Sequence, residues 1–179
     1  MTITKKGETM KQEIKLVSSF IFDEEDLSCL LSNASANICG VQWWKPADQA
    51  DYDEAKAQLI AERKPATEDD VYTEDVWARM MVNGKKLLLL DPESDWHWSG
   101  HKKGELLWSW QIINEGCEPV GGEWHAVGLD DIAKAIVAYG KGHVANDCGA
   151  DLRKINENGD FWDADAVMQY AMYGDVIYG

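Results

Sequence analysis

The order of apolar and polar positions along the chain predicts an alternation of strands and helices. Residues 13–22, EIKLVSSFIF, are rich in β-branched and aromatic types and predict a strand. The next stretch, DEEDLSCLLSNASA, predicts a helix with Asp23 as its N-cap and acids in its first turn. Apolar residues recur in it at helical spacing, at Leu27, Leu30, Leu31 and Ala34. After Gly40, VQWW predicts a short strand.

The segment from residue 45 to residue 75 is polar and lacks a long apolar stripe. Its middle, DYDEAKAQLIAERK, predicts a short helix, because acids at its start and bases at its end complement the helix dipole. Pro65 follows and would end that helix. We expect the rest of the segment to be exposed.

The dipeptide Asn83-Gly84 stands between two strand-like runs in VWARMMVNGKKLLLLD. A two-residue Asn-Gly loop suits the type I′ turn, in which both residues have positive φ and the turn matches the twist of the flanking strands. The pattern therefore predicts a β-hairpin centred on this dipeptide.

The C-terminal half predicts a loop, two short elements and a helix. Residues 92–104 are typical of a loop, and 105–116, ELLWSWQIINEG, fit either a helix ended by Gly116 or a strand. We expect a turn at CEPVGG, a strand at EWHAV and a helix at GLDDIAKAIVAYG.

The chain ends in FWDADAVMQYAMYGDVIYG, which predicts a helix capped by Asp160 and stopped by Gly174. Its expected buried face consists of Ala164, Val167, Met168 and Ala171. The last five residues, DVIYG, would return to the sheet as a strand.

These elements predict an α+β fold in one domain of residues 13–179, with residues 1–12 as a flexible N-terminal extension. We expect an antiparallel sheet of about five strands with helices packed on one side. A hydrophobic content of 45% over 179 residues is enough for a substantial core.

The net charge of −15 is unevenly distributed. Residues 23–75 hold 14 Asp and Glu against four Lys and Arg, a net charge of −10. Such a field repels phosphate backbones and anionic lipids and attracts a basic groove on another macromolecule, so we expect no direct binding to nucleic acid or membrane. Solubility alone is the alternative explanation of this charge.

Localisation is predicted from what the chain lacks. The longest apolar run is as short as KKLLLLD, and the N-terminus has lysines but no apolar core of a signal peptide. We therefore expect a cytoplasmic protein whose four cysteines are reduced thiols. The oligomeric state stays open.

Four metal-ligand types fall close together, at His97, His101, Cys117 and His125, and four such ligands fit a tetrahedral zinc site. The spacing lacks paired short Cys/His knuckles, so we expect unrelated histidines and a buried thiol, with no metal or cofactor. The chain also shows no nucleophile motif, and acids such as those of DADA and LDD are explained by helix capping. We predict that the protein is not an enzyme.

Nine tryptophans are many for a core of this size. Trp77, Trp110 and Trp162 lie on apolar faces and predict core positions. Trp96 and Trp98 lie in the predicted loop, where an exposed tryptophan often anchors a partner. An aromatic site for a base or nucleotide is the alternative use of this pair.

Three groups of motifs resemble a family of small acidic phage and mobile-element proteins of gut Firmicutes. They are DLSCLLSNAS followed by GVQWW, then KLLLLDPE with the later GLDDIAKAIVAY, and finally the closing DADAVMQYAMYGDVIYG. The resemblance spans Phe20 to Gly179, and the segment 93–127 looks like an addition to the usual pattern. It implies an accessory protein of a mobile element in a bacterial cytoplasm, and it assigns no catalytic residues.

Acidity, small size and this context together predict an anti-defence, anti-CRISPR-like inhibitor. It would occupy the basic nucleic-acid groove of a host effector, with Cas9 as the leading candidate, because spaced carboxylates can stand in for phosphates. The predicted partner-binding residues are Asp48, Asp51, Asp53, Glu54, Glu68, Asp69, Asp70, Glu74, Asp75, Trp96 and Trp98.

Three alternatives stay open. The first is a sponge for a nucleotide immune signal, with Trp96, Trp98 and Lys102 or Lys103 in a pocket that would need several cations. The second is a hydrolase or metalloenzyme that uses the histidines between residues 97 and 125. The third is an accessory interaction protein of the mobile element.

Overall fold

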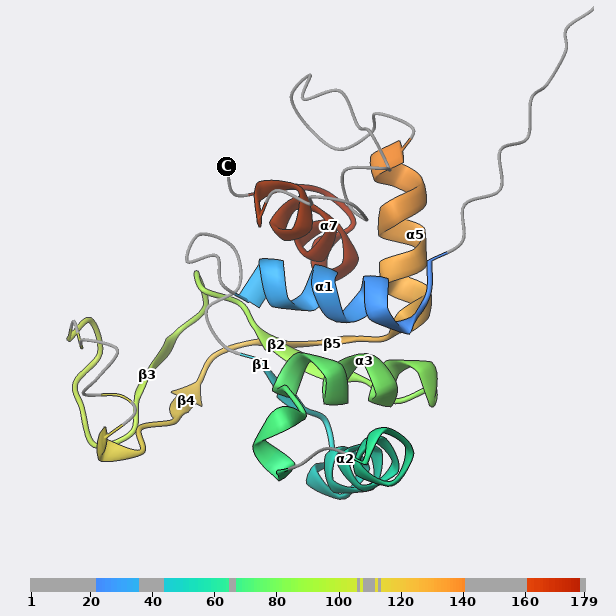
Figure 1. Ribbon diagram of the computed structural model, residues 1–179. Coiled ribbons are helices and arrows are strands. Elements are labelled where there is room, and N and C mark those ends of the chain that lie inside the picture. The colour runs from blue at the N-terminus through green and yellow to red at the C-terminus, as the bar shows by residue number, and fades with distance from the viewer. Residues whose placement is uncertain are drawn as a thin grey trace, which may run out of the picture.

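The computed structural model describes residues 22–35, 44–64, 67–105, 107, 112, 114–140 and 161–177 (Figure 1). In chain order its elements are α1 (Glu24–Ser35), β1 (Trp44–Pro46), α2 (Gln49–Arg63), the 3₁₀ helix η1 (Glu68–Asp70), α3 (Thr73–Val82), β2 (Leu87–Leu90), β3 (Trp96–Trp98), β4 (Pro119–Gly121), β5 (Trp124–Val127), α5 (Leu129–Gly140) and α7 (Phe161–Tyr173). The α+β class predicted from the sequence is confirmed.

Strand β2 is the centre of a three-stranded antiparallel sheet with the order β1-β2-β5. Trp44 of β1 pairs with Leu89 of β2, and Trp124 of β5 pairs with Leu90. Strand β2 reads LLLL, and three of its four residues are fully buried, which agrees with the continuous apolar run expected of a covered central strand.

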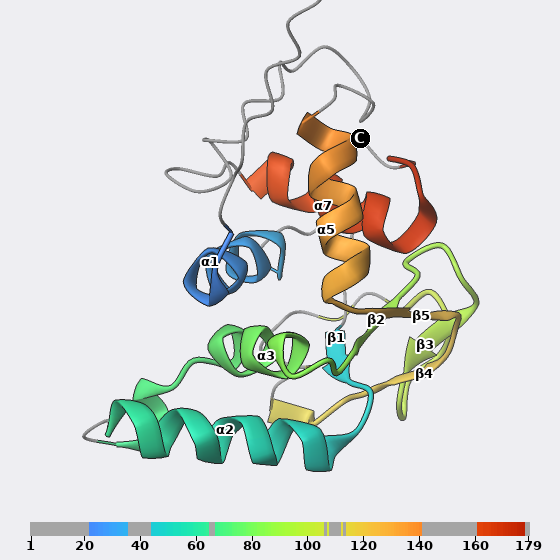
Figure 2. The ribbon, with the colours of Figure 1, turned by 90° about the vertical axis from the view of Figure 1, so that its right-hand side faces the viewer.

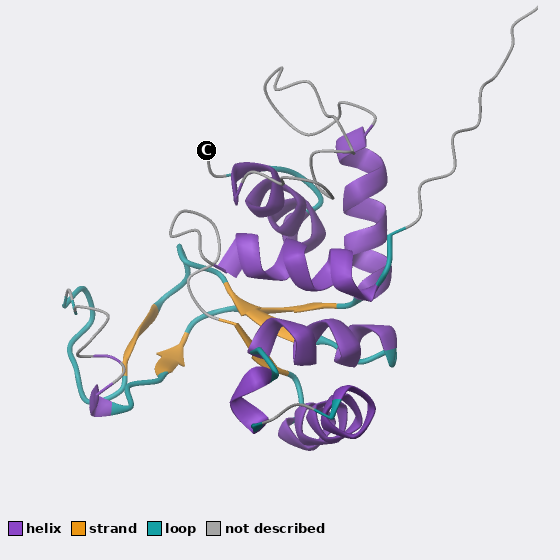
Figure 3. Ribbon diagram, viewed as in Figure 1, coloured by secondary structure: helices purple, strands orange, loops and turns teal. Residues whose placement is uncertain are grey.

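Strands β3 and β4 form a second antiparallel sheet, in which Trp98 pairs with Pro119. The expectation of one sheet of about five strands is therefore wrong: the described residues form one sheet of three strands and another of two. Figure 3 shows the two-stranded sheet extending away from the helices. Residues 92–104 were expected to be a loop and CEPVGG a turn, but they contribute β3 and β4.

The helices surround the larger sheet. Figures 1 and 2 both place α1, α5 and α7 above the level of β2 and β5 and place α2 below it. The prediction of helices on one side of the sheet is therefore wrong. Helix α1 packs on α3 and α7, α5 packs on α7, and α2 packs on α3.

One hydrophobic cluster joins these elements. Leu59 of α2, Met80 of α3, Leu87 of β2, Ile132 of α5 and Val167 of α7 belong to it, and all are fully buried. The four apolar positions predicted for α1 are buried in the same cluster. Helical spacing in the sequence therefore identified the face of α1 that contacts the core.

The hairpin predicted around Asn83-Gly84 is wrong, because the run before it is helix α3. Asn83 has φ −75° and Gly84 has φ +78°, whereas a type I′ turn needs both to be positive. The Gly84 N–H donates to the Met81 carbonyl at 2.9 Å and the Lys85 N–H donates to the Met80 carbonyl at 2.9 Å. These two bonds form a Schellman motif, a second local structure that an Asn-Gly pair satisfies.

The predicted terminal helix is confirmed as α7, with Ala164, Val167 and Met168 buried. Its end is also as predicted, since Gly174 has φ +75° and donates to the Tyr170 carbonyl at 2.8 Å. The expected return strand is not formed by residues 175–177. The Ile177 N–H instead donates to the Gln169 side chain at 3.0 Å.

Several predictions fall on residues outside the described ranges: the strand at 13–22 (apart from Phe22), the extension at 1–12, most of VQWW and the cap at Asp160. Of the ambiguous stretch 105–116, Ile112, Asn114 and Glu115 are helical. Gly116 follows with φ +62°. These residues agree with the helical alternative for that stretch.

Candidate functional site

Helix α2 carries the first group of predicted partner-binding acids. Asp48 is its N-cap, and the Asp48 carboxylate accepts a hydrogen bond from the Ala50 N–H at 2.9 Å. Asp53 and Glu54 are exposed, and each accepts a hydrogen bond from a glutamine amide four residues away along the helix. These three residues are exposed, and none of them forms an ion pair with a described residue, although, after the bond to Asp51, the charges of Glu54 and Asp48 help to raise the pKa of Lys85.

Three other predicted acids are engaged within the fold. Asp51 pairs with Lys85 at 2.6 Å, and this contact raises the pKa of the lysine. Asp75 pairs with Arg63 at 2.6 Å and accepts from the Ser28 hydroxyl at 2.7 Å. Glu74 accepts from a serine of α1 at 3.5 Å. These carboxylates connect α1, α2, α3 and the turn between α3 and β2, and their residues are only partly exposed.

The short helix η1 carries the remaining acids. Asp70 and Thr67 form a capping box, in which the Asp70 carboxylate accepts from the Thr67 N–H at 2.8 Å. Glu68 is exposed and lies 3.9 Å from the Lys56 ammonium, which joins η1 to the middle of α2. Asp69 belongs to η1, but its side chain lies outside the described part of the chain.

The structure therefore separates the predicted acids into two groups. Five exposed carboxylates follow α2 and η1, and we call them the acidic surface: Asp48, Asp53, Glu54, Glu68 and Asp70. Asp51, Glu74 and Asp75 instead make ion pairs or hydrogen bonds with residues of other elements, and we call residues that do so internal ties. Spacing along the chain gave no sign of this division, because the cations involved come from other elements.

Arg79 is an internal tie that sequence reasoning missed. Its guanidinium binds both carboxylate oxygens of Glu62, at 2.9 and 2.7 Å, and binds Glu24 at 2.8 Å. The hydrogen bonds lower the pKa of Glu62 and raise the pKa of Arg79. One side chain of α3 thus links α1 to α2.

The predicted pair Trp96 and Trp98 lies in strand β3 rather than in a loop. The two rings meet edge to face, with centroids 5.2 Å apart, and both residues are half-buried. The Trp96 indole N–H donates to the Pro92 carbonyl at 3.2 Å. The contact between the two rings therefore covers part of the apolar surface that the sequence analysis assigned to a partner.

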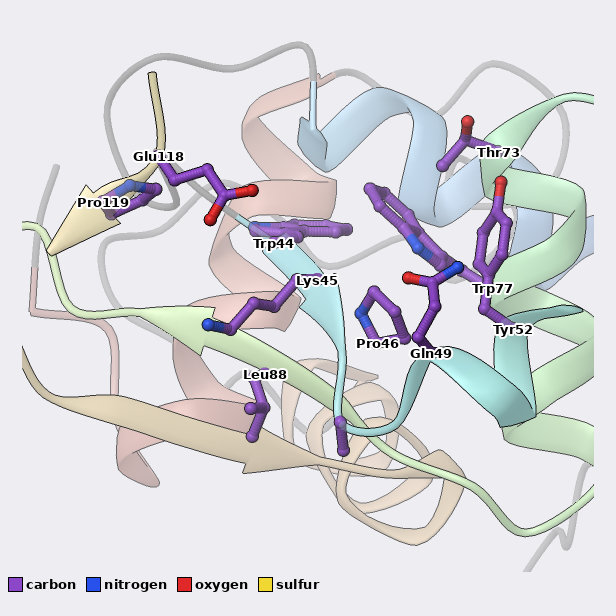
Figure 4. Close-up of a pocket in the computed structure, with 11 residues that line it drawn as sticks. Trp44, Lys45, Pro46, Gln49, Tyr52, Thr73, Trp77, Leu88, Glu118 and Pro119 are labelled. Atoms are coloured by element: carbon purple, nitrogen blue, oxygen red, sulfur yellow. The ribbon is translucent and has the colours of Figure 1, made fainter. Parts of the chain in front are cut away.

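An open pocket of about 560 Å³ lies between β1, α2, α3 and the start of β4 (Figure 4). Trp44 of β1 and Trp77 of α3 face each other in it, with ring centroids 5.5 Å apart, and Tyr52 of α2 adds a third aromatic ring. Trp77 packs against the core, as predicted, while the side chains of Trp110 and Trp162 lie outside the described part.

The polar lining of this pocket does not suit an anionic nucleotide. It includes one lysine, Lys45, and one acid, Glu118. The Lys45 ammonium also stands over the Trp124 ring, 4.0 Å from its centroid. The sponge hypothesis placed its site at Trp96, Trp98 and Lys102 or Lys103; none of these residues lines this pocket, so the pocket does not test that hypothesis.

Two of the four metal-ligand candidates lie in different sheets, and the other two, His101 and Cys117, lie outside the strands. His97 lies in β3, opposite Val120, and His125 lies in β5, opposite Leu89. His125 approaches the Asp91 carboxylate at 3.8 Å and is therefore engaged apart from the other three. Within the described residues, these four side chains do not come together as one cluster.

His101 and Cys117 do meet, and Glu115 joins them. One ligand atom from each of the three residues lies within 4.8 Å of the others. His101 contacts Glu115 through Nε2 at 3.1 Å and Glu105 through Nδ1 at 3.4 Å. The bonds to Glu105 and Glu115 raise the pKa of His101, and burial followed by the Glu115 charge raises the pKa of the Cys117 thiol. Sequence analysis missed both glutamates: Glu105 is only four residues from His101, whereas Glu115 is brought to it from 14 residues away.

Comparisons with family models, with characterised proteins and with solved structures give no match to this chain. Within the described ranges, every helix is too short or too polar to cross a bilayer. The function must therefore be argued from the charges and contacts of the chain itself.

Proposed function

We propose that the protein is an anti-defence inhibitor that binds the basic nucleic-acid groove of a host effector through its acidic surface. The effector class is a nucleic-acid-handling protein, with guide-loaded Cas9 as the first candidate. The observation that carries the proposal is the set of five exposed carboxylates on α2 and η1. It rests on charge and on the resemblance to mobile-element proteins.

The acidic surface suits a basic partner for an electrostatic reason. Its carboxylates are placed on helical elements, and the hydrogen bonds of Asp48, Asp53 and Asp70 restrict their side chains. Fixed negative charges on a chain of net charge −15 attract a groove built to hold phosphates. Binding would exclude nucleic acid by occupying the same lysines and arginines.

The ion pairs within the fold reduce the number of acids that can be used to test the proposed interface. Neutralising Asp51 or Asp75 would break the contacts with Lys85 or Arg63, so a loss of binding in those variants would not separate folding from recognition. The exposed acids provide the cleaner test. Trp96 and Trp98 stay in the proposal as residues of a separate surface on β3.

The test measures binding of the full chain to a purified Cas9–guide complex at several salt concentrations. Affinity should fall steeply between about 50 and 200 mM salt, as expected when charges replace phosphates. The four-fold variant Asp53→Asn, Glu54→Gln, Glu68→Gln, Asp70→Asn should slow association by about tenfold or more. Asn and Gln keep the hydrogen-bond acceptors that α2 and η1 use.

A matched control removes the same number of charges elsewhere: Glu25→Gln, Glu93→Gln, Glu123→Gln and Asp130→Asn. All four residues are exposed and lie outside α2 and η1. Equal losses of binding in the two variants would show that the net charge, and not the acidic surface in particular, drives association. Salt-insensitive binding, or no binding to effectors with basic grooves, would reject the proposed mechanism.

A further inference from the structure

The ladder between β3 and β4 brings two distant segments together. Trp98 pairs with Pro119 at its end. One step further, the Ser99 N–H donates to the Glu118 carbonyl at 2.8 Å, and the Glu118 N–H donates to the Ser99 hydroxyl at 3.0 Å. The chain before Ser99 and the chain after Glu118 are therefore held in one register, and the residues just beyond this ladder must lie close together.

Each of the two segments makes a turn just beyond the ladder, and the side chains of His101 and Cys117 come together there. The His101 N–H donates to the Trp98 carbonyl at 3.0 Å, across Gly100 with φ +79°. On the other segment, the Cys117 N–H donates to the Ile112 carbonyl at 3.0 Å. Both turns use backbone bonds, so the positions of the two side chains are set by the fold and not by their own contact.

We propose that His101, Glu115 and Cys117 form a Zn²⁺ site, with His101 Nε2, a Glu115 carboxylate oxygen and the Cys117 sulfur as ligands. One ligand atom of each residue lies within 4.8 Å of the other two, and the His101 Nε2 to Glu115 Oε2 distance is 3.1 Å. Zinc bonds of about 2.0–2.3 Å place tetrahedral ligands about 3.4 Å apart. Small side-chain movements therefore bring the set to that spacing.

The chemistry of the ligands selects the metal. A thiolate, an imidazole and a carboxylate suit zinc, whereas magnesium and calcium prefer oxygen ligands alone. Three protein ligands leave the fourth tetrahedral position to a water molecule. The cysteine is buried, with 5% of its surface exposed, while the glutamate is exposed at the rim.

Glu105 is a positioning residue in this proposal. Its carboxylate is fixed by the Lys102 N–H at 3.1 Å and lies 3.4 Å from His101 Nδ1. A carboxylate that accepts from one ring nitrogen of a histidine presents the other nitrogen to the metal. Here that other nitrogen is Nε2, which lies 3.1 Å from Glu115 Oε2.

A plain ion-pair contact of His101 with Glu105 and Glu115 is the competing explanation of the cluster. The ion-pair contact does not involve the Cys117 sulfur, so binding of a metal to this thiol distinguishes the Zn²⁺ site from the ion-pair contact. The experiment uses the full chain with Cys29→Ser, Cys39→Ser and Cys148→Ser, which leaves Cys117 as its sole thiol. Co²⁺ is added as the spectroscopic probe and Zn²⁺ as the competing metal.

We expect one Co²⁺ per chain, a thiolate-to-cobalt charge-transfer band, and loss of that band when Zn²⁺ displaces the probe. In the same background, Cys117→Ser should abolish the band. His101→Gln and Glu115→Gln should each weaken Zn²⁺ binding by more than about tenfold, and Glu105→Gln should weaken it by about 10–100-fold with the band retained. His97→Gln and Glu118→Gln are the matched controls and should bind Zn²⁺ as the parent does.

Absence of the band in the chain with Cys117 as its sole thiol would overturn the proposal in favour of the ion-pair contact. Unchanged affinity in the exposed Glu115→Gln variant would overturn it as well, since this variant keeps the Cys117 thiol and removes only one proposed ligand. The outcome is independent of effector binding, because the site lies beyond β3 and β4 and the acidic surface lies on α2 and η1.

Discussion

At the scale of single residues, charged side chains in this protein act first as ties within the fold. Arg79 binds two glutamates from two other helices, and Lys85 and Arg63 each hold an aspartate. The net charge of −15 therefore overstates the number of carboxylates that a partner can reach. Only tertiary contacts show which acids belong to the acidic surface.

Asp165 is the buried acid for which the pH dependence can be predicted. It is 4% exposed, accepts from the Gln169 amide at 2.7 Å, and its Oδ1 has no hydrogen-bond partner within the described chain. Burial raises the pKa of this carboxyl, although the bond from Gln169 opposes the shift. The folded protein thus holds the proton more tightly than the unfolded chain.

The direction in which stability changes with pH follows from this difference in proton affinity between the folded and unfolded states. Stability from the protonated form is lost as the pH rises from the ordinary carboxyl value of 3.8 through the raised pKa of the folded state. Asp165→Asn cannot ionise, so we expect a higher melting temperature than the parent at pH 7. The difference should shrink toward pH 4 in thermal unfolding followed by circular dichroism. The exposed Asp130→Asn control should show no such trend, and an Asp165→Asn gain that is constant with pH would contradict the argument.

At the scale of elements, α3 shows how one local signal can serve two structures. An Asn-Gly pair fits a hairpin turn, and it equally fits the end of a helix when only the glycine has positive φ. Acids at Glu74 and Asp75 in the first turn favour the helix. The spacing of buried Val76, Met80 and Met81 agrees with the helical period.

The end of α3 is testable by substitution. Nothing lies within 4 Å of a Cβ placed on Gly84, so Gly84→Ala loses stability only through its left-handed backbone. We expect a loss of about 1–2 kcal/mol in chemical denaturation. Gly84→Asn should cost less, because asparagine tolerates this conformation.

Asn83→Ala is the control that separates the two structures. In the helix end it loses only the bond from Asn83 to the Gln58 side chain at 3.0 Å, since the Asn83 backbone has negative φ. In a type I′ hairpin both positions would need positive φ. Equal losses for Asn83→Ala and Gly84→Ala would therefore contradict the Schellman motif.

At the scale of the whole molecule, one core connects segments from both halves of the described chain. Leu31 of α1 and Met168 of α7 are fully buried in it, and α1 contacts both α3 and α7. The larger sheet joins β1 and β2 from the first half to β5 from the second. The core therefore predicts that these parts unfold together.

Two large-to-small substitutions test this prediction. Leu31→Ala and Met168→Ala should each lower the free energy of unfolding by about 2–5 kcal/mol. In both variants, tryptophan fluorescence and far-ultraviolet circular dichroism should report one common, lowered midpoint. Separate transitions for the two probes, or a loss confined to one of them, would show that the halves fold independently. Val137→Ala, at an exposed position of α5, is the control and should change little.

The candidate sites were predictable only in part. Most of α2 could be predicted from the chain, because dipole effects act within one turn, but its start at Gln49 and its Asp48 cap were not predicted. His101 and Cys117 stood out in the sequence only as two of four metal-ligand types, with His97 and His125, and no metal site was predicted from them. Their true neighbour, Glu115, depends on the pairing of β3 with β4.

The sequence by itself determined the α+β class, the helices α1, α2, α5 and α7 and the apolar faces of α1 and α7, because side-chain spacing and capping are local properties. Only the tertiary structure decided that the Asn-Gly pair ends a helix and that the strands form two sheets. It also decided which acids lie exposed on the acidic surface and that His101 lies beside Cys117. These features depend on contacts between segments far apart in the chain, whose register is set by strand pairing and core packing rather than by local pattern.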